Sequence, residues 1–404
     1  MRFYCNMTVI ALKYRLCSLH SGFLHMSYMM RSRLFLSLIA VYAVCCLILV
    51  LTYLPGHDTL YYLDWSRHLA LGYYDGPPVV AYYMRLFTIA LGYSRPALIL
   101  VGLLSHVLIA SLIFLLAKTL FNKEVGQYAF FIWLFTPMTF GLYALQVTYD
   151  TPACIFSLLT LYLFFMFHRK KGNIYIYAAA VAGSLMMLSK LTGAIVFISL
   201  VFLMLTKHYR YLFKNKHIYF SFVLAMVLVV PIMIWGAEVG KEGLVFQVHH
   251  GLSSWSIDHV FKTVVYIAAN LGMYNVFLLI FSYCYIRHFR AIQASAELQL
   301  VFIPAMTIFL FYLLTSPALI KPGWNDLFYS TVPIAISYYM VLNRSIIYKI
   351  ARASLMFYAC LLLIMTFLLV PKIARLFHLD RFVINNVEKN LALEIAPIIQ
   401  HKRF

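Results

Sequence analysis

The chain has 404 residues, of which 64% are hydrophobic and only 11% charged, and its mean hydropathy is +0.86. A soluble domain is about 45–50% apolar and about 25% charged, so composition excludes a water-soluble globular protein and favours many membrane spans. The net charge of +19 does not indicate nucleic-acid binding, because the basic residues lie between apolar runs and form no single patch. The seven cysteines have no CxxC spacing and most lie inside apolar runs, so no zinc site or disulfide framework is predicted.

About eleven apolar runs follow one another along the chain and are predicted to be transmembrane helices. They cover residues 34–53, 97–117, 125–143, 152–167, 174–188, 191–205, 218–235, 260–286, 300–314, 327–342 and 354–370. Several are shorter than a full crossing, which local bilayer thinning or polar flanks would accommodate. The run 79–91 is shorter still and is predicted to lie at the interface. The expected fold is an all-α polytopic bundle.

The spans define one transmembrane unit, residues 34–371, between an N-terminal tail, 1–33, and a short basic C-terminal tail, 372–404. The first residues do not resemble a domain, and Met29 and Met30 just ahead of Arg31 suggest a translation start nearer the first span. No cleavable signal peptide is evident, so the first span is expected to act as its own signal.

Charges in the connections predict the orientation. With the N-terminus in the cytoplasm, every cytoplasmic connection carries Lys or Arg, in agreement with the positive-inside rule. Most acidic residues then fall on the outer side: Asp58, Asp64, Asp75, Asp150, Glu238, Glu242, Asp258 and Asp326. Acids contribute little to orientation, so this asymmetry indicates either that the outer face holds the chemistry or that these are ordinary solvated loops.

The first outer loop, HDTLYYLDWSRHLALGYYDGPP at residues 57–78, is the most informative stretch. Tyr62, Trp65, Leu69 and Tyr73 fall at helical spacing, which predicts an amphipathic interfacial helix. The Pro-Pro pair after it restricts the backbone and makes a stiff loop, a suitable way to fix Asp75 at the membrane surface.

This loop resembles the bacterial members of glycosyltransferase family 39. These are GT-C-type relatives of the protein O-mannosyltransferases and of the lipid A aminoarabinose transferases. Further motifs resemble those of the family: TYDTP at 148–152, LSKLTG at 188–193, WGAE at 235–238, FQVHHG at 246–251 and GWND at 323–326. The similarity covers about residues 34–370. One departure is that many members have Asp-Glu where this chain has Asp58-Thr59, which makes a protein hydroxyl a less favoured acceptor.

The resemblance implies a GT-C-like bundle with interfacial helices in its first outer loop, located in a bacterial inner membrane. It implies transfer of a hexose or pentose, with inversion, from a polyprenyl-phosphate donor on the periplasmic or extracellular side. The acceptor implied is an envelope glycolipid or glycan such as lipid A or lipopolysaccharide core. A transporter or flippase of lipid-linked sugars is the alternative, although the predicted span interiors contain almost no charge.

Transfer from a lipid phosphate requires a group that stabilises the leaving phosphate and a base for the acceptor hydroxyl. Asp58 is the candidate base, although an Asp at this position is also suited to cap the following helix. Asp75 and Asp150 are candidates for contacts with sugar or acceptor hydroxyls, and Asp150 is equally suited to cap the next span.

Lys190 is the candidate phosphate ligand, and snorkelling to the interface is the structural alternative. Arg67 and Arg85 are alternative phosphate partners, because Arg binds phosphate in a bidentate manner.

His249 and His250 are adjacent in an outer loop. They suit polar contacts with the acceptor, and a His pair also suits a divalent cation, but no carboxylate or Cys follows at ligand spacing, so no metal ligand is assigned. Tyr61, Tyr62 and Trp324 are candidates for stacking on sugar or isoprenoid, and interfacial anchoring explains them equally well.

Overall fold

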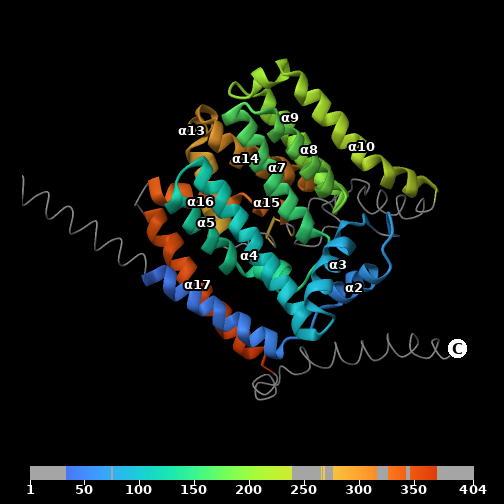
Figure 1. The fold of residues 1–404 in the computed structure, drawn as a ribbon. Helices are drawn as coiled ribbons and strands as arrows, with labels where there is room; N and C mark the ends of the chain where they lie inside the picture. Colours follow the sequence, from blue (N-terminus) through green and yellow to red (C-terminus); the bar gives the residue numbers. More distant parts are fainter. Residues whose placement is uncertain are drawn as a thin grey trace, which may run out of the picture.

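The structure of the chain is a computed structural model, which describes residues 33–73, 76–238, 265, 267–268, 276–315, 326–342 and 346–370. Helices make up most of this part (Figure 1), and its β structure is limited to an isolated bridge between Tyr73 and Gly76. The predicted all-α fold is therefore confirmed.

The helices follow one another along the chain, and within each continuous described stretch the connections between them are short. They are the N-terminal helix Arg33–Thr52, α2 His57–Arg67, α3 Val79–Leu91, α4 Arg95–Leu120, α5 Lys123–Phe135, α6 Pro137–Thr139, the π-helix η1 Phe140–Ala144, α7 Asp150–Lys170, α8 Asn173–Met187, the 3₁₀ turn η2 Leu191–Gly193, α9 Ala194–Leu205, η3 Arg210–Lys214, α10 Lys216–Glu238, the helix Val276–Arg287, α13 Phe289–Ala294, α14 Ala296–Thr315, α15 Asp326–Tyr329, α16 Val332–Leu342 and α17 Ile346–Leu368.

Within the described residues, 6 helices are long and apolar enough to cross a membrane: Arg33–Thr52, α4, α7, α10, α14 and α17. Helix α5 and the segment Pro137–Ala144 pass the same test as a pair but are bent by 63°. The predicted continuous span 125–143 is therefore broken. The break falls at Thr136-Pro137, because proline disfavours helical geometry in the residue before it and cannot donate a backbone hydrogen bond.

The shorter apolar helices Asn173–Met187 and Leu191–Leu205 agree with predicted spans, and α3 coincides with the run predicted to be interfacial. Val332–Leu342 covers the later part of the run 327–342, and Val276–Arg287 covers only the end of the run 260–286, most of which lies outside the described residues.

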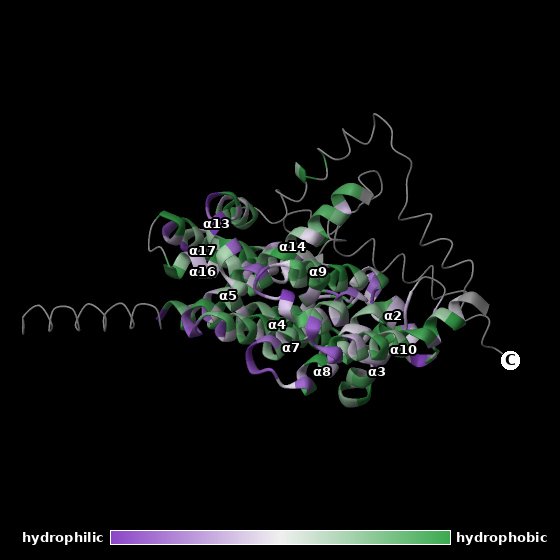
Figure 2. Ribbon diagram, turned by 90° about the horizontal axis from the view of Figure 1, so that it is seen from above, coloured by the Kyte–Doolittle hydropathy of each residue, from purple (hydrophilic) through white to green (hydrophobic). Residues whose placement is uncertain are grey.

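Figure 2 shows most of the helical ribbon in the colours of hydrophobic residues. Helix α10, at the edge of the bundle in Figure 1, exposes a run of large apolar side chains that includes Phe222, Val223, Val227 and Met233. Side chains of this kind on the outside of a bundle are suited to contact with lipid.

The interior is built from two groups of buried apolar side chains. The larger one joins the N-terminal helix to α4, α5, α7, α14, α16 and α17. In it, Phe35 stacks on Phe131 with ring centroids 5.0 Å apart, and Tyr42 is hydrogen-bonded to His106 at 2.9 Å. The smaller group lies beneath α2 and α3 and contains Tyr62, Trp65, Met84 and Val147 among others. This second group fixes the first connection of the chain against the bundle.

The amphipathic helix predicted to continue to Tyr73 is shorter than expected, since α2 ends at Arg67. The Tyr73 hydroxyl donates to the carbonyls of Trp65 (3.0 Å) and His68 (2.9 Å), and its ring stacks on Trp65 at 4.0 Å. Tyr73 therefore folds back over the end of α2 rather than extending it. Backbone hydrogen bonds in both directions then link Tyr73 to Gly76.

Glycine at position 102 allows α4 to press against η1. A Cβ placed there would lie 2.5 Å from the carbonyl oxygen of Ala144, and a backbone atom cannot move aside as a flexible side chain can. A Cβ at Gly141, in η1 itself, would meet nothing within 4 Å.

We predict that Gly102→Ala destabilises the protein by about 1–3 kcal/mol, the usual range for overpacking. The Gly141→Ala variant, which introduces the same group into open space, is expected to unfold close to the wild type. Thermal unfolding of both variants in one detergent measures the difference. Equal midpoints for the two variants would contradict the close approach of α4 to η1.

Candidate active site at one end of the bundle

Helix α2 presents Asp58 to solvent at its first turn. The N-cap is Gly56 and makes no side-chain capping bond, so the suggested capping role of Asp58 is wrong. The Asp58 side chain is 59% exposed, and its carboxylate lies 3.9 Å from the His57 ring. A negative charge in a first turn is favoured by the helix dipole. Asp58 is thus a solvent-accessible carboxylate on a rigid helical turn.

The neighbour of Asp58 anchors this turn to the bundle. The buried Thr59 hydroxyl accepts a hydrogen bond of 2.9 Å from the backbone N–H of Val147. Val147 belongs to the connection that leads into α7, whose first residue is Asp150. Thr59 stands where many relatives have Glu, and here it makes the link between the first outer loop and the start of α7.

Asp150 and Lys190 form a buried ion pair. Their side chains are only 13% and 9% exposed, and Lys190 Nζ contacts Asp150 Oδ1. The Thr148 hydroxyl contacts the other carboxylate oxygen at 3.3 Å and accepts from the Asp150 backbone N–H at 3.2 Å. Lys190 therefore turns into the protein rather than snorkelling outward. The N-cap of α7 is Tyr149, so the suggested capping role of Asp150 is wrong as well.

Tyr149 connects this ion pair to α2. Its ring centroid lies 5.3 Å from Lys190 Nζ, within the range of a cation–π contact. The other neighbour of the ring is Tyr62 of α2, which is buried and packs edge-on with the centroids 5.8 Å apart. Tyr62 therefore has a packing role, whereas the adjacent Tyr61 is partly exposed.

The start of α3 closes the other side of the site. The Val79 N–H donates to the carbonyl of Leu188, two residues before Lys190, at 3.0 Å. The connection before α7 thus contacts the start of α2, and the connection between α8 and α9 contacts both the start of α3 and the start of α7. Figure 1 shows α2 and α3 together on one side of the bundle.

Gly72 and Tyr73, shortly before Asp75 in the sequence, each make a close contact with a helix. Burial raises the pKa of the Tyr73 phenol, so this hydroxyl remains a protonated donor to the end of α2 at neutral pH. Gly72 approaches α10 closely, because a Cβ there would lie 2.4 Å from the Trp235 ring. Asp75 itself lies outside the described residues, as do His249, His250 and Trp324.

Arg67 and Arg85 do not take part in the Asp150–Lys190 pair. The Arg67 guanidinium carbon lies 5.2 Å from the Tyr93 ring centroid, and Arg85 Nη1 donates to the Tyr93 hydroxyl. The structure thus places the predicted basic residues in two separate clusters. Sequence analysis did not single out Thr148, Tyr149 or Tyr93 as contributors, although Thr148 and Tyr149 stand inside the quoted TYDTP motif.

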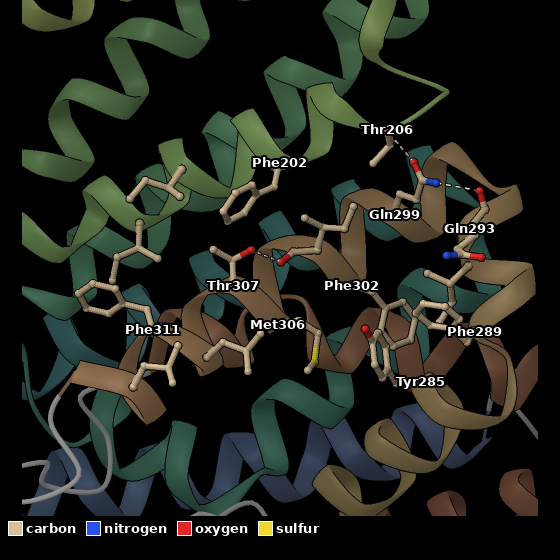
Figure 3. Close-up of a pocket in the computed structure, with 16 residues that line it drawn as sticks. Phe202, Thr206, Tyr285, Phe289, Gln293, Gln299, Phe302, Met306, Thr307 and Phe311 are labelled. Atoms are coloured by element: carbon tan, nitrogen blue, oxygen red, sulfur yellow. Dashed lines mark hydrogen bonds between the residues drawn. The ribbon is translucent and has the colours of Figure 1, made fainter. Parts of the chain in front are cut away.

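An elongated groove of about 580 Å³ lies between α9 and α14. Figure 3 shows Phe202, Phe302, Met306 and Phe311 along it. At one end the Thr206 hydroxyl donates to Gln299 Oε1 at 2.7 Å. The groove is therefore mainly apolar, with the Thr206–Gln299 hydrogen bond at one end. Its other end includes Ile195, which follows Lys190 of the buried ion pair by five residues.

Among the described residues, no group of three or more His, Cys, Asp or Glu side chains is arranged to hold a metal ion. The His pair that suggested a cation is outside this part of the chain.

These features define a polytopic helical membrane protein with the GT-C fold. The fold is similar to that of ArnT from Cupriavidus metallidurans in the apo state, with a TM-score of 0.60 and 20% identity over 76% of this chain. The crystal structure of the same protein bound to undecaprenyl phosphate gives a TM-score of 0.61 and 19% identity, again over 76% of this chain. The chain spans 59% and 60% of the length of those two ArnT chains.

The family described as dolichyl-phosphate-mannose-protein mannosyltransferase matches residues 75–235. No curated protein sequence matches the chain. The chain thus resembles the mannosyltransferase and lipid A aminoarabinose transferase relatives within the GT-C superfamily, as the sequence motifs predicted. The matched region includes Asp150 and Lys190 and begins after Asp58.

We predict that Asp150 and Lys190 are strongly coupled in stability. Removing one partner leaves a buried charge without compensation, which costs about 3–5 kcal/mol. Asp150→Asn and Lys190→Met are each expected to lower the free energy of unfolding by about this amount. The double variant should lower it by much less than the sum of the two single effects. Unfolding in detergent measures the cycle, with Asp64→Asn as the control for the same change at an exposed carboxylate of α2. Strictly additive effects would contradict a direct ion pair.

Proposed function

We propose that this protein is a membrane glycosyltransferase that moves a sugar from a polyprenyl-phosphate donor to the hydroxyl of an envelope glycolipid or glycan. The observation that carries the proposal is the hydrogen bond between Val147 and Thr59, which joins the turn bearing Asp58 to the connection that leads into the buried Asp150–Lys190 pair. The GT-C fold and the mannosyltransferase family match support the same activity. The undecaprenyl phosphate bound to the similar ArnT supports a lipid-linked donor.

The chemistry requires one bond to form and one to break. The acceptor oxygen attacks the anomeric carbon, the bond from that carbon to the phosphate oxygen breaks, and the polyprenyl phosphate leaves with the bonding electrons. A single displacement of this kind inverts the anomeric centre. The sugar transferred is a hexose or a pentose, as the family resemblance implies.

Asp58 acts as the base in this proposal. It is exposed enough to reach an acceptor that arrives from water, and Thr59 holds its turn in place through Val147. The carboxylate takes the proton of the acceptor hydroxyl as the new bond forms. A positioned base of this kind contributes about 10²–10⁴-fold to a rate.

Lys190 stabilises the departing phosphate. An ammonium has three N–H donors, so the cation can be shared between Asp150 and a phosphate oxygen. Because Lys190 is buried, its interaction with a developing negative charge is weakly screened by water. Asp150 keeps the ammonium in place between turnovers and is positioned for hydrogen bonds with sugar hydroxyls.

The groove between α9 and α14 provides a place for the isoprenoid tail. Ile195 near one of its ends follows Lys190 by five residues, and the distance along α9 from Ile195 to Thr206 is about 17 Å. A lipid with its phosphate at Lys190 would lay its first isoprene units against Phe311, Met306 and Phe202.

The positive-inside distribution supports placing this end of the bundle on the non-cytoplasmic side of a bacterial inner membrane. The alternative of a transporter or flippase is less well supported. A transporter uses charged residues near the bilayer midplane, whereas Asp150 and Lys190 stand at the start of α7 and just before η2 and α9.

We predict that Asp58→Asn lowers the rate of sugar transfer by at least about a hundredfold, because an amide cannot accept the proton. The matched control is Asp64→Asn, six residues further along α2 and also exposed, which is expected to retain activity. Transfer from an undecaprenyl-phosphate sugar to lipid extract, with equal amounts of each purified variant, measures the rates. The glycolipid profile of a deletion strain carrying each variant gives a second readout. Wild-type transfer by Asp58→Asn would remove Asp58 from the role of base.

The proposed orientation predicts the accessibility of introduced cysteines. In a background without native cysteines, Asp64→Cys should react with a membrane-impermeant maleimide added to intact cells. Arg210→Cys, on η3 at the other end of α9, should react only after permeabilisation. The reverse pattern would place the site in the cytoplasm and end the proposal of an outward-facing transferase.

A further inference from the structure

A second cationic cluster lies at the far end of α2 from Asp58. Arg67, in the last turn of α2, stacks its guanidinium over the Tyr93 ring with 5.2 Å between the guanidinium carbon and the centroid. Arg85, in the middle of α3, donates from Nη1 to the hydroxyl of the same tyrosine. We refer to Arg67, Arg85 and Tyr93 as the arginine–tyrosine cluster.

The turn between α3 and α4 places Tyr93 between the two arginines. Helix α3 ends at Leu91, and its C-cap Gly92 has a φ of 81°, in the left-handed region that glycine adopts readily. Ser94 then caps α4 by accepting from the Ala97 N–H at 3.3 Å. Tyr93 is the one residue between the caps Gly92 and Ser94. Its hydroxyl contacts Arg85, eight residues earlier on α3.

The two arginines lack an ion-pair partner within the described part of the chain, although Asp64 stands three residues before Arg67 on α2. Lys190, by contrast, has Asp150. Arginines that only snorkel would extend separately into water. Here both arginines contact the side chain of Tyr93. The planar guanidinium group of each suits bidentate recognition of phosphate.

The cluster borders an apolar surface. On α3, Leu86 and Ile89 are 67% and 71% exposed, and the partly exposed Tyr82 precedes Arg85 on the same side of the helix at i−3. Helical spacing aligns Tyr82, Leu86 and Ile89 as one stripe. An exposed apolar stripe next to basic side chains is the pattern of a lipid site, with chains along the stripe and a phosphate at the cations.

We propose that the arginine–tyrosine cluster binds the phosphate of a membrane lipid, whose chains lie along Tyr82, Leu86 and Ile89. This site is built from different side chains than the proposed donor phosphate site, since Arg67 and Arg85 contact Tyr93 whereas Lys190 contacts Asp150. Asp58 and Arg67 are nine residues apart on α2, which is about 14 Å along the helix axis. The lipid is recognised by a phosphate headgroup together with an acyl or isoprenoid chain.

The test uses the purified full-length protein in a neutral detergent and a fluorescent phosphatidic acid as the probe. Its binding is followed by anisotropy and compared with that of the matching phosphatidylcholine. We expect the phosphatidic acid to bind at least tenfold more tightly. The double variant Arg67→Gln/Arg85→Gln should lose this preference, with at least a tenfold rise in Kd. Exposed Arg210→Gln, on η3, is the control for removal of a positive charge and should bind as the wild type does.

Two further variants keep the result interpretable if the double variant folds poorly. Arg67→Lys/Arg85→Lys keeps both charges and should bind with an intermediate Kd, because an ammonium lacks the planar fork. Tyr93→Phe removes only the hydroxyl that holds Arg85 and should weaken binding by a few-fold. Wild-type binding by well-folded Arg67→Gln/Arg85→Gln protein would overturn the proposal.

Inorganic phosphate distinguishes a lipid site from a simple anion site. It should displace the phosphatidic acid only at concentrations far above the Kd of the lipid, because it cannot contact the apolar stripe. Displacement at equal concentrations would refute the lipid as the ligand. Since Asp58 lies outside the cluster, Asp58→Asn protein should bind the probe normally, so failure of the proposed transfer activity would leave this result unaffected.

Discussion

The buried contact between Asp150 and Lys190 is the constraint on which the proposed site depends. Neither charge would be stable alone in a nearly water-free position at the end of a helical bundle, so each requires the other. The pair joins the connection before α7 to the connection between α8 and α9. Because the Tyr149 ring contacts Lys190 and packs edge-on against Tyr62, the pair also constrains where α2 lies, and through α2 the position of Asp58. One electrostatic contact therefore sets the relative positions of the proposed base and the proposed phosphate ligand.

Several predicted apolar runs coincide with described helices, because a helix in lipid requires a long apolar run. However, only 6 described helices are long enough to cross a membrane, against about eleven spans predicted. The predicted run 79–91 coincides with α3, and 174–188 differs from α8 by one residue at each end. The break at Pro137 was missed, since an apolar run does not reveal a bend within it. The end of α2 at Arg67 was missed for a different reason. The spacing of Leu69 and Tyr73 continues the helical period, but the Tyr73 hydroxyl binds the carbonyls at the end of the helix.

The sequence suggested members of the candidate site but not their contacts. Motif resemblance suggested Asp58, Asp150 and Lys190 from the sequence. Whether the two acids cap helices and whether Lys190 extends to the membrane interface could be judged only from the fold. Lys190 and Asp150 are 40 residues apart, and no helical or strand periodicity connects positions so distant. Thr59 illustrates the same limit. Its hydroxyl has a partner 88 residues away, in a loop with no pattern of its own.

The two basic clusters differ in a way that has consequences for ligand binding. Lys190 is already neutralised and buried, so a phosphate that binds there must give up its water and compete with a carboxylate. Such a site favours a ligand delivered from the membrane and is insensitive to salt. Arg67 is exposed and lacks a carboxylate partner among the described residues, so the arginine–tyrosine cluster should attract anions over a longer range and weaken as ionic strength rises. A membrane enzyme with both would separate capture of a charged lipid at its surface from the selective step at its buried pair.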